Sequence, residues 1–350
     1  MTTTSSHTAR LPAGLAAVLA VLSSSAVVID SNDRVLQASE AARSLGLVKG
    51  NELVVGELLA LARQVRRDGE IREGEIDIST GGIPNRTTSF AVRVAPLGPA
   101  VGGGGLVLLL VEDQTERRRV EEVRRDFVAN TSHELKTPVG ALALLAETIE
   151  DAADDPEAVR RFAGRMRQEA NRLTNLVQDM ITLSRIQAAE PMPDPARVEL
   201  DSVVAEALDR GRMKATARGI ELAYTGTRRL AVLGDEELLV TALRNLLDNA
   251  VAYSPEKTRV LVSTCLDGNM VELSVADQGI GIPERDLERI FERFYRVDPA
   301  RSRVTGGTGL GLAIVKHVTA AHGGKVTVTS KEGAGSTFTL CLPVRPGVPS

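Results

Sequence analysis

The stretch RRDFVANTSHELKTPVGALALLAE, residues 124–147, decides the fold of the middle of this chain. Apolar side chains recur in it at alternating spacings of three and four residues, the pattern of a helix that packs along a seam. If Val128 is placed at heptad position a, the a and d positions on this helix continue to Ile149. The pattern therefore predicts a long helix whose apolar stripe faces a partner.

A second helix with the same period follows. Its a and d positions run from Val159 to Leu183, with one acidic exception at Glu169, and the stretch DAADDPE at 151–157 separates the two helices. Two such helices cannot bury both seams well alone, so we expect a homodimeric four-helix bundle. The predicted hairpin, with its entry helix, covers residues 113–187.

His133 falls at heptad position f, farthest from the seam, so it is predicted to face solvent on a rigid helix. Pro138 lies inside the same helix, where a proline costs about 3 kcal/mol, and this suggests a functional bend. A neutral imidazole can attack a γ-phosphate, and the adjacent Glu134 can accept the proton from its other ring nitrogen. Thr137, one turn further on, could hydrogen-bond the water that the reverse reaction needs.

These residues carry a family resemblance, because FVANTSHELKTPVGAL, residues 127–142, resembles the H box of HisKA-class sensor kinases. The resemblance implies that His133 is the phosphoacceptor. It likewise implies that Glu134 is the acid/base and that Glu134 and Thr137 form the phosphatase motif.

A linker at residues 188–196 contains three prolines, and an α/β sandwich is predicted over residues 197–345. Helices are expected at 201–218, 235–253 and 310–322, and strands at 220–225, 259–266, 270–277, 325–330 and 336–344.

Four motifs in this last region indicate a nucleotide site. In NLLDNAVAYS, residues 245–254, Asn245 and Asn249 project from one helix face, and an amide oxygen suits Mg²⁺. In VADQGIGIP, residues 275–283, Asp277 could accept a hydrogen bond from the exocyclic amine of adenine, and the following glycines let the backbone approach the ring. In IFERFYRVD, residues 290–298, a lid could place Tyr295 and Arg296 near the nucleotide.

The fourth motif, GTGLGLAIVKH at residues 307–317, leads glycines into a helix N-terminus that can bind an anion. The chain contains no G-x-x-x-x-G-K-[ST] motif, which excludes a P-loop ATPase. In this order the four motifs resemble the N, G1, F and G2 boxes of the GHKL ATP-binding fold, and the resemblance covers residues 120–345.

The GHKL resemblance implies ATP and Mg²⁺ as cofactors, with Asn249 as the metal ligand. The nucleotide-binding residues that it implies are Asn245, Asn249, Tyr253, Asp277, Gly279, Gly281, Tyr295, Arg296, Gly307, Thr308, Gly309, Leu310 and Gly311. One position departs from the pattern: Ala252 stands where many members carry a phosphate-binding lysine, which leaves the nucleotide affinity open.

Residues 1–112 are predicted to form a small α+β sensor domain that resembles a PAS domain. Strands are expected at 25–30, 34–38, 73–78, 89–97 and 105–113, and a helix from Glu52 to Arg67. No histidine lies between residues 8 and 132 and no cysteine before Cys265, so a haem held by histidine or a flavin held by cysteine has no ligand there.

Residues 11–29 carry no charge. A buried helix followed by the first strand is favoured for them over a membrane span, because Pro12, Gly14 and three serines interrupt the apolar run. The two remaining histidines of the C-terminal region, His317 and His322, stand near a helix end before Gly323, where a cation would complement the helix dipole.

Composition limits the function classes. A formal net charge of −4 argues against a nucleic-acid partner, and two distant cysteines fit a reducing cytosol. The whole pattern predicts a multidomain α+β sensor histidine kinase that acts as a homodimer and passes phosphate to the receiver domain of a response regulator. We expect it in the cytoplasm, with association with the inner face of the membrane left open.

The stretches at 124–147 and LDNAVAYSP, residues 247–255, resemble the phosphate-responsive, PhoR-type sensor kinases of high-GC bacteria, which implies phosphate-starvation signalling. Two alternatives remain at this point. One is a GHKL ATPase that forms no phosphohistidine, and the other is a dimeric scaffold without catalysis.

Overall fold

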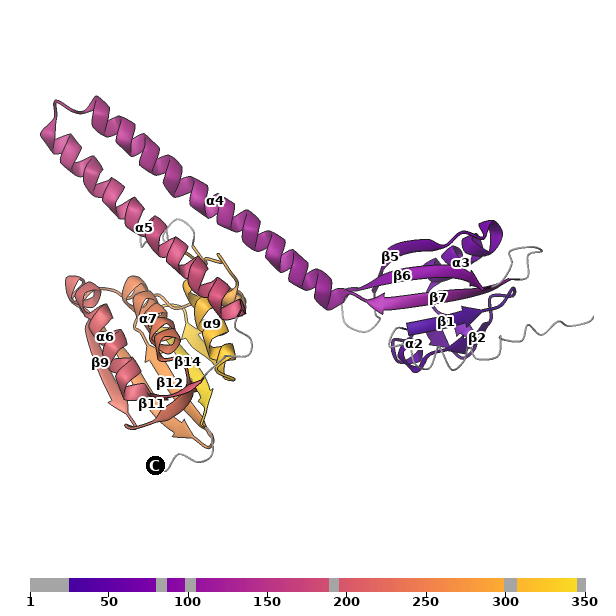
Figure 1. Cartoon of the computed structure of the whole chain (residues 1–350). Coiled ribbons are helices and arrows are strands. Elements are labelled where there is room, and N and C mark those ends of the chain that lie inside the picture. Colours follow the sequence, from indigo (N-terminus) through magenta and orange to yellow (C-terminus); the bar gives the residue numbers. More distant parts are fainter. Residues whose placement is uncertain (1–24, 80–86, 98–104, 189–194, 299–306, 345–350) are drawn as a thin grey trace, which may run out of the picture. The chain divides into compact units, whose positions relative to one another are not determined.

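The computed structural model describes residues 25–79, 87–97, 105–188, 195–298 and 307–344. The chain divides into two compact units, residues 1–126 and 127–350, and the helix α4 runs across the boundary between them. Figure 1 shows the helices and strands of both units.

The first unit is built on a five-stranded antiparallel sheet in the order β2-β1-β7-β6-β5. Its strands are β1 (Ser25–Ile29), β2 (Val35–Ala38), β5 (Arg72–Ser79), β6 (Thr87–Leu97) and β7 (Leu106–Asp113). The helices α2 (Glu40–Ser44) and α3 (Gly56–Asp68), with the small hairpin of β3 (Val48–Lys49) and β4 (Glu52–Leu53), cover one face of the sheet. A smaller apolar cluster lies on the opposite face.

The end of this sheet is tied to the start of α4 (Thr115–Asp151). The hydroxyl of Thr115 accepts a hydrogen bond from the Ser89 backbone N–H at 3.1 Å. Arg118 donates to the carboxylate of Asp77 at 3.2 Å and also contacts Glu75. The first turns of the long helix are therefore bound to β5 and β6 by polar contacts.

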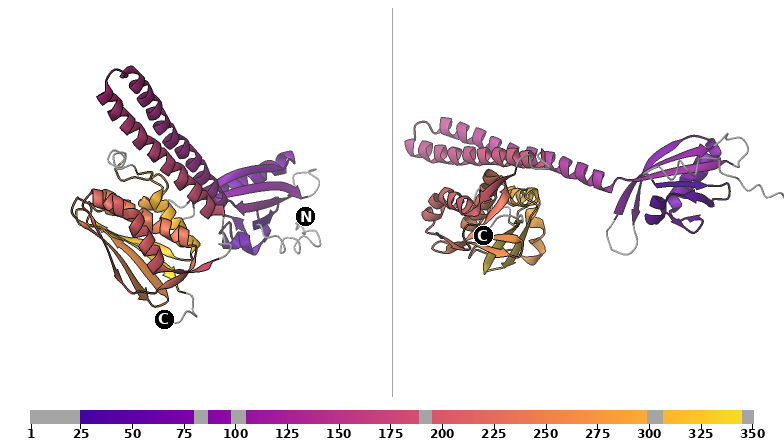
Figure 2. Two further views of the ribbon diagram at one scale, coloured as in Figure 1. Left: turned by 60° about the vertical axis from the view of Figure 1, so that its left-hand side comes forward. Right: turned by 60° about the horizontal axis from the view of Figure 1, so that its bottom comes forward.

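The second unit begins with an antiparallel helical hairpin formed by α4 and α5 (Pro156–Ala188), which lie side by side in both views of Figure 2. Pro156 is the first residue of α5, a position where the missing N–H has no helical partner anyway. The Asp155 carboxylate accepts from the backbone N–H groups of Glu157 and Ala158, at 3.0 and 3.1 Å, and so caps the helix. These contacts explain why the chain turns at the predicted break.

The predicted seam is confirmed along α5, where every assigned position from Val159 to Leu183 is buried or half-buried. On α4 the frame is wrong at its start, because Val128 is 58% exposed. Phe127 points inward instead and pairs with Phe294 at a ring-centroid distance of 6.1 Å. The packing at this end of α4 therefore follows Phe127, one residue before the predicted position.

The rest of the second unit is an α/β sandwich, in which one five-stranded sheet is covered on one face by three helices (Figure 1). The sheet order is β13-β14-β12-β11-β9, and only the β9–β11 pair is parallel. The strands are β9 (Glu221–Gly226), β11 (Arg259–Asp267), β12 (Met270–Ala276), β13 (Lys325–Lys331) and β14 (Gly335–Pro343). The helices are α6 (Leu200–Ala217), α7 (Glu236–Tyr253) and α9 (Gly311–Ala321).

Smaller elements complete this body: the two-stranded ladder of β8 (Ala196–Glu199) and β10 (Ala231–Gly234), and the short helices η1 (Glu284–Asp286) and η2 (Arg289–Phe291). One apolar core runs through the sandwich and includes Leu176, Leu183 and Ile186 of α5. The C-terminal half of α5 is therefore packed onto the same core as the sandwich.

Within the described ranges, no helix has both the length and the apolar character that a membrane crossing requires. Of the predicted segment at 11–29, residues 25–29 form the buried strand β1, and residues 11–24 lie outside the described part of the chain.

Candidate active site

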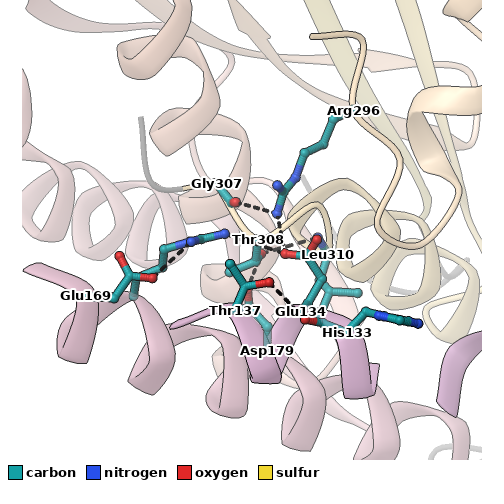
Figure 3. A network of polar contacts seen from close by, with 10 residues as sticks. His133, Glu134, Thr137, Glu169, Asp179, Arg296, Gly307, Thr308 and Leu310 are labelled. Atoms are coloured by element: carbon teal, nitrogen blue, oxygen red, sulfur yellow. Dashed lines mark hydrogen bonds and ion pairs between the residues drawn. The ribbon is translucent and has the colours of Figure 1, made fainter. Parts of the chain in front are cut away.

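His133 lies on α4 with its side chain exposed, as the heptad frame predicts. Pro138 is buried within the same helix, which continues through it to Asp151. The hydroxyl of Thr137, also exposed, donates to the carbonyl oxygen of His133 at 3.2 Å. Histidine and threonine thus lie one turn apart on the accessible side of the hairpin (Figure 3).

Glu134, the neighbour of His133, is held through one carboxylate oxygen by two arginines. Arg296 donates to Oε2 at 3.0 Å, and a guanidinium nitrogen of Arg172 lies 3.5 Å from the same oxygen. Arg172 belongs to α5, whereas Arg296 follows η2 in the sandwich. The carboxylate beside the exposed histidine therefore connects the hairpin to the sandwich (Figure 3).

Arg296 and Tyr295 are both engaged within the protein. Arg296 also donates to the Gly307 carbonyl oxygen at 2.8 Å, and its side chain is only 9% exposed. The Tyr295 hydroxyl donates to Asp286 at 2.6 Å, a hydrogen bond that raises the pKa of Tyr295, and the guanidinium of Arg289 lies over its ring. Of the two predicted lid residues, Arg296 thus contacts the first glycine of the glycine-rich loop, and Tyr295 contacts the short helix η1.

The predicted polar residues of α7 lie on one face of that helix at intervals of one turn. Asn245 donates from its amide to the Thr241 carbonyl at 3.0 Å, which orients its Oδ1 atom toward Gly311. A Cβ atom at Gly311 would lie 2.8 Å from that oxygen, so a side chain there would clash unless the Asn245 amide moved. Asn249 and Tyr253 follow along the helix, both half-buried.

Asp277 stands at the end of β12, where the strand passes into the predicted adenine loop. Its Oδ1 accepts hydrogen bonds from the backbone N–H groups of Gly279 at 2.8 Å and Ser336 at 3.2 Å. Burial raises the pKa of this carboxyl group, against the lowering effect of the two hydrogen bonds. A Cβ at Gly279 would lie 2.9 Å from the Tyr253 carbonyl oxygen, so glycine brings this loop against the end of α7.

The loop at 307–311 is held by Thr308. Its hydroxyl donates to the Asp179 carboxylate of α5 at 2.7 Å and accepts from the Leu310 N–H at 3.2 Å. Gly309 has a φ of 74°, and its carbonyl accepts from the Phe294 N–H at 2.8 Å. The loop that precedes α9 thus contacts both the lid residues and the hairpin.

The structure brings the predicted residues together in one body. His133, Glu134 and Thr137 come from α4, and the glycine-rich loop and Arg296 approach Glu134 from the sandwich (Figure 3). The sequence did not indicate two further residues of this site, Arg172 and Asp179. Glu169, the acidic exception in the seam, was the one available signal, because it pairs with Arg172 at 3.1 Å.

The residues fit a bound nucleotide with its metal ion. The close approaches at Gly279 and Gly311 leave little room for side chains beside Asp277 and Asn245, as a loop that touches a ligand with its backbone requires. Among the described residues no group of three or more histidine, cysteine, aspartate or glutamate side chains could hold a metal ion. A hard ion would therefore rely on the Asn249 amide oxygen and on phosphate oxygens, which suits Mg²⁺.

Comparison with known proteins gives two family matches. Residues 123–189 match the His Kinase A (phospho-acceptor) domain, and residues 234–346 match the histidine kinase-, DNA gyrase B- and HSP90-like ATPase family.

Individual relatives extend these matches over most of the chain. The chain is 46% identical over 338 residues to the sensor-like histidine kinase SenX3 of Mycobacterium tuberculosis, covering 94% of this chain and 80% of SenX3. It is 38% identical over 234 residues to the phosphate regulon sensor protein PhoR of Pseudomonas aeruginosa, covering 66% of this chain and 53% of PhoR. The crystal structure of the histidine kinase ThkA with the response regulator protein TrrA shares the fold, with a TM-score of 0.53, 20% identity, and coverage of 95% of this chain and 98% of that one.

Proposed function

The chain belongs to the sensor histidine kinases of two-component systems, and from that premise we propose that His133 is the residue it phosphorylates with ATP. The observation that carries the proposal is the position of His133. It is exposed on the hairpin, and its neighbour Glu134 contacts Arg296, which in turn contacts the glycine-rich loop.

The chemistry assigns each group a role. A ring nitrogen of His133 attacks the γ-phosphorus, an N–P bond forms, the bond to the bridging β,γ-oxygen breaks, and ADP leaves. Glu134 accepts the proton from the other ring nitrogen and stabilises the imidazolium. Because Arg296 holds Glu134 in this arrangement, Arg296 must release the carboxylate before it can contact the phosphates.

The nucleotide is proposed to bind between α7, the loop after β12 and the loop before α9. Asp277 would accept from the adenine amine, and the N–H groups of Gly307, Gly309 and Gly311 would donate to the phosphates. Asn245 would help to hold the phosphates. Mg²⁺ on Asn249 would neutralise the charge on the phosphate oxygens.

The remaining residues of the predicted nucleotide site are assigned to its walls: Tyr253, Gly279, Gly281, Tyr295, Thr308 and Leu310. Ala252 supplies no cation, and Arg218 donates to its carbonyl at 2.9 Å. We therefore assign the phosphate-contacting cation to Arg296.

Labelling with γ-labelled ATP and Mg²⁺ tests the assignment. The wild-type chain should acquire label that is lost in acid and stable in base, and His133→Gln should acquire none. Hydrolysis of ATP by a chain that never takes up label would overturn the proposal in favour of a GHKL ATPase. The match of residues 123–189 to the phospho-acceptor domain speaks against that alternative and against a scaffold without catalysis.

We further propose a homodimer that transfers the phosphoryl group to an aspartate of a receiver domain and reverses the transfer through a water held by Thr137. The name of PhoR, a phosphate regulon sensor protein, supports phosphate-responsive signalling as its biological setting. Phosphotransfer from labelled chain to candidate receiver domains, ranked by initial rate, would identify the cognate regulator.

Two finer assignments complete the proposal. The five-stranded antiparallel sheet of residues 25–113, with helices on one face, supports a PAS-like sensor as the input domain. We assign the protein to the cytoplasm or to the inner face of the cell membrane, and fractionation of cells that express the full-length chain distinguishes the two places.

A further inference from the structure

A short row of charged side chains crosses the interior of the helical hairpin. Glu169 of α5 accepts a hydrogen bond from Arg172 of the same helix at 3.1 Å, and Arg172 lies 3.5 Å from Glu134 of α4. The side chains of Glu169, Arg172 and Glu134 are 22, 14 and 30% exposed. The three charged side chains are therefore mostly shielded from solvent, and Glu169 stands at a position of the seam that is otherwise apolar.

Such a row is not needed to hold the hairpin together. Burying charges in a packed seam costs desolvation energy, and apolar side chains of similar volume often stabilise such sites as well or better. Leu173 and Leu176 already supply apolar contacts on the same turn of α5. The row of charges ends at the carboxylate of Glu134, beside the exposed His133, and this indicates that the row serves the reaction.

The two arginines on Glu134 differ in origin. Arg296 belongs to the sandwich and is joined to the glycine-rich loop through Gly307, so it reaches Glu134 only while that body is docked on the hairpin. Arg172 belongs to the hairpin itself, so its contact with Glu134 involves no residue of the sandwich.

We propose that Arg172, oriented by Glu169, is a positioning residue that holds the Oε2 atom of Glu134 so that Oε1 can accept the proton from His133. This inference rests on the proposed phosphorylation of His133. Without Arg172 the glutamate side chain can adopt several rotamers on the helix surface, and the geometry for proton acceptance is populated for a smaller fraction of the time. Arg172 itself touches neither nucleotide nor His133 in this assignment.

The test compares initial rates of autophosphorylation in the full-length chain, with γ-labelled ATP and Mg²⁺, for wild type and Arg172→Met. We expect kcat to fall by roughly tenfold to a hundredfold, the range for a misplaced catalytic group, while KM for ATP stays within about twofold. Arg172→Lys should recover part of the loss, because it restores the charge without the planar fork. Arg165→Met, at an exposed arginine of the same helix, is the matched control and should label at the wild-type rate.

A charge exchange separates positioning from simple stabilisation. Glu169→Arg combined with Arg172→Glu retains an ion pair on α5 but places a carboxylate against Glu134. A structural role predicts that the exchange restores activity, whereas the proposed role predicts that it stays as low as Arg172→Met. Thermal unfolding of each variant is measured alongside, and if the exchanged chain does not fold, Arg172→Met alone decides.

The outcomes are distinct from those of the proposed function. If the wild type never labels at His133, the proposed function fails. If the wild type labels and Arg172→Met labels at the same rate, the positioning role fails and the assignment of His133 stands. A fall in rate that is accompanied by an equal loss of folded protein also overturns the positioning role.

Discussion

At the scale of single residues, His322 is a buried histidine whose contacts fix its protonation state. It ends α9, where its Nε2 accepts from the Asp235 N–H at 3.1 Å and its Nδ1 lies 2.8 Å from the Val318 carbonyl. Such a ring carries its proton on Nδ1 and is neutral, because a second proton on Nε2 would face an N–H group. His322 therefore caps the C-terminal end of α9 as a neutral hydrogen-bond donor, and not as the cation that its place beside the helix end predicts, since burial lowers its pKa.

This histidine should make the second unit sensitive to mild acid. Its folded-state pKa lies below 6.5, so the neutral ring contributes stability above that pH, and the contribution is lost as the pH falls through the folded pKa. The melting temperature of the wild type should fall between pH 7.5 and 5. His322→Gln should be less stable at pH 7.5, by about 1–3 kcal/mol, but should lose less on acidification. Equal slopes for the two chains, measured by thermal unfolding, would contradict the assignment.

Gly281 is a second single residue with a measurable consequence. Its φ is 70°, and a Cβ there would lie 2.1 Å from the Lys331 carbonyl oxygen. Gly333 has a similar φ of 78° but open space around it, so it serves as a matched control. Gly333→Ala should cost about 1 kcal/mol of backbone strain. Gly281→Ala should cost clearly more and should also weaken ATP binding, as read from chemical denaturation and nucleotide titration.

At the scale of elements, we expect the contact between α5 and the glycine-rich loop to compete with a nucleotide at the proposed site. The Asp179 carboxylate accepts a hydrogen bond from the Thr308 hydroxyl, which belongs to the wall of the proposed nucleotide site, and burial raises the pKa of Asp179. Arg244 and Asp248 act on the same carboxyl group in opposite directions.

Removal of that carboxylate should therefore strengthen ATP binding. Asp179→Ala frees the loop hydroxyl and removes a negative charge, so the Kd for ATP should fall several-fold. In a Thr308→Val background the same substitution should have a smaller effect, because the shared hydrogen bond is already lost. Asp209→Ala, at an exposed aspartate of α6, is the control. Weaker ATP binding by Asp179→Ala, in calorimetric titrations, would contradict the competition.

The sequence predicts elements well where period and turn chemistry agree. The seam from Val159 to Leu183, the break before Pro156 and the exposure of His133 all follow from a sustained heptad pattern. The five strands of the second sheet each begin or end within two residues of their predicted limits. These features depend on local patterns that one element carries alone.

The rest depends on contacts between elements, which a single pattern does not encode. The ladder of β8 and β10 pairs residues 32 to 38 positions apart, with Val198 opposite Val232, and neither strand has enough residues to show a period. The register of α4 at Phe127 depends on a ring of the sandwich, Phe294. Arg172 and Asp179 look like ordinary polar positions on α5 until their partners on α4 and in the glycine-rich loop are placed.

At the scale of the whole molecule, the hairpin leaves apolar side chains exposed that a second copy of the chain would cover. Val177 and Ile181 are exposed one turn apart on α5, and Val139 and Leu144 are exposed on α4. Val177→Glu with Ile181→Glu should therefore shift the protein from dimer to monomer in sedimentation equilibrium. Met213→Glu, at an exposed residue of α6, should leave the dimer intact. A wild type that sediments as a monomer at all concentrations would contradict the dimer itself.

The continuity of α4 has a consequence for how a stimulus can travel. This single helix of 37 residues begins among the polar contacts of Thr115 and Arg118 and includes His133. A stiff rod can pass on torsion or tilt, and each residue advances it by about 100°. Splicing two residues in after Arg125 would put the two ends about 200° out of phase, whereas seven would return them to within about 20°. If the kinase activity depends on the rotational phase of the insertion and not on its length, rotation of α4 about its own axis transmits the signal.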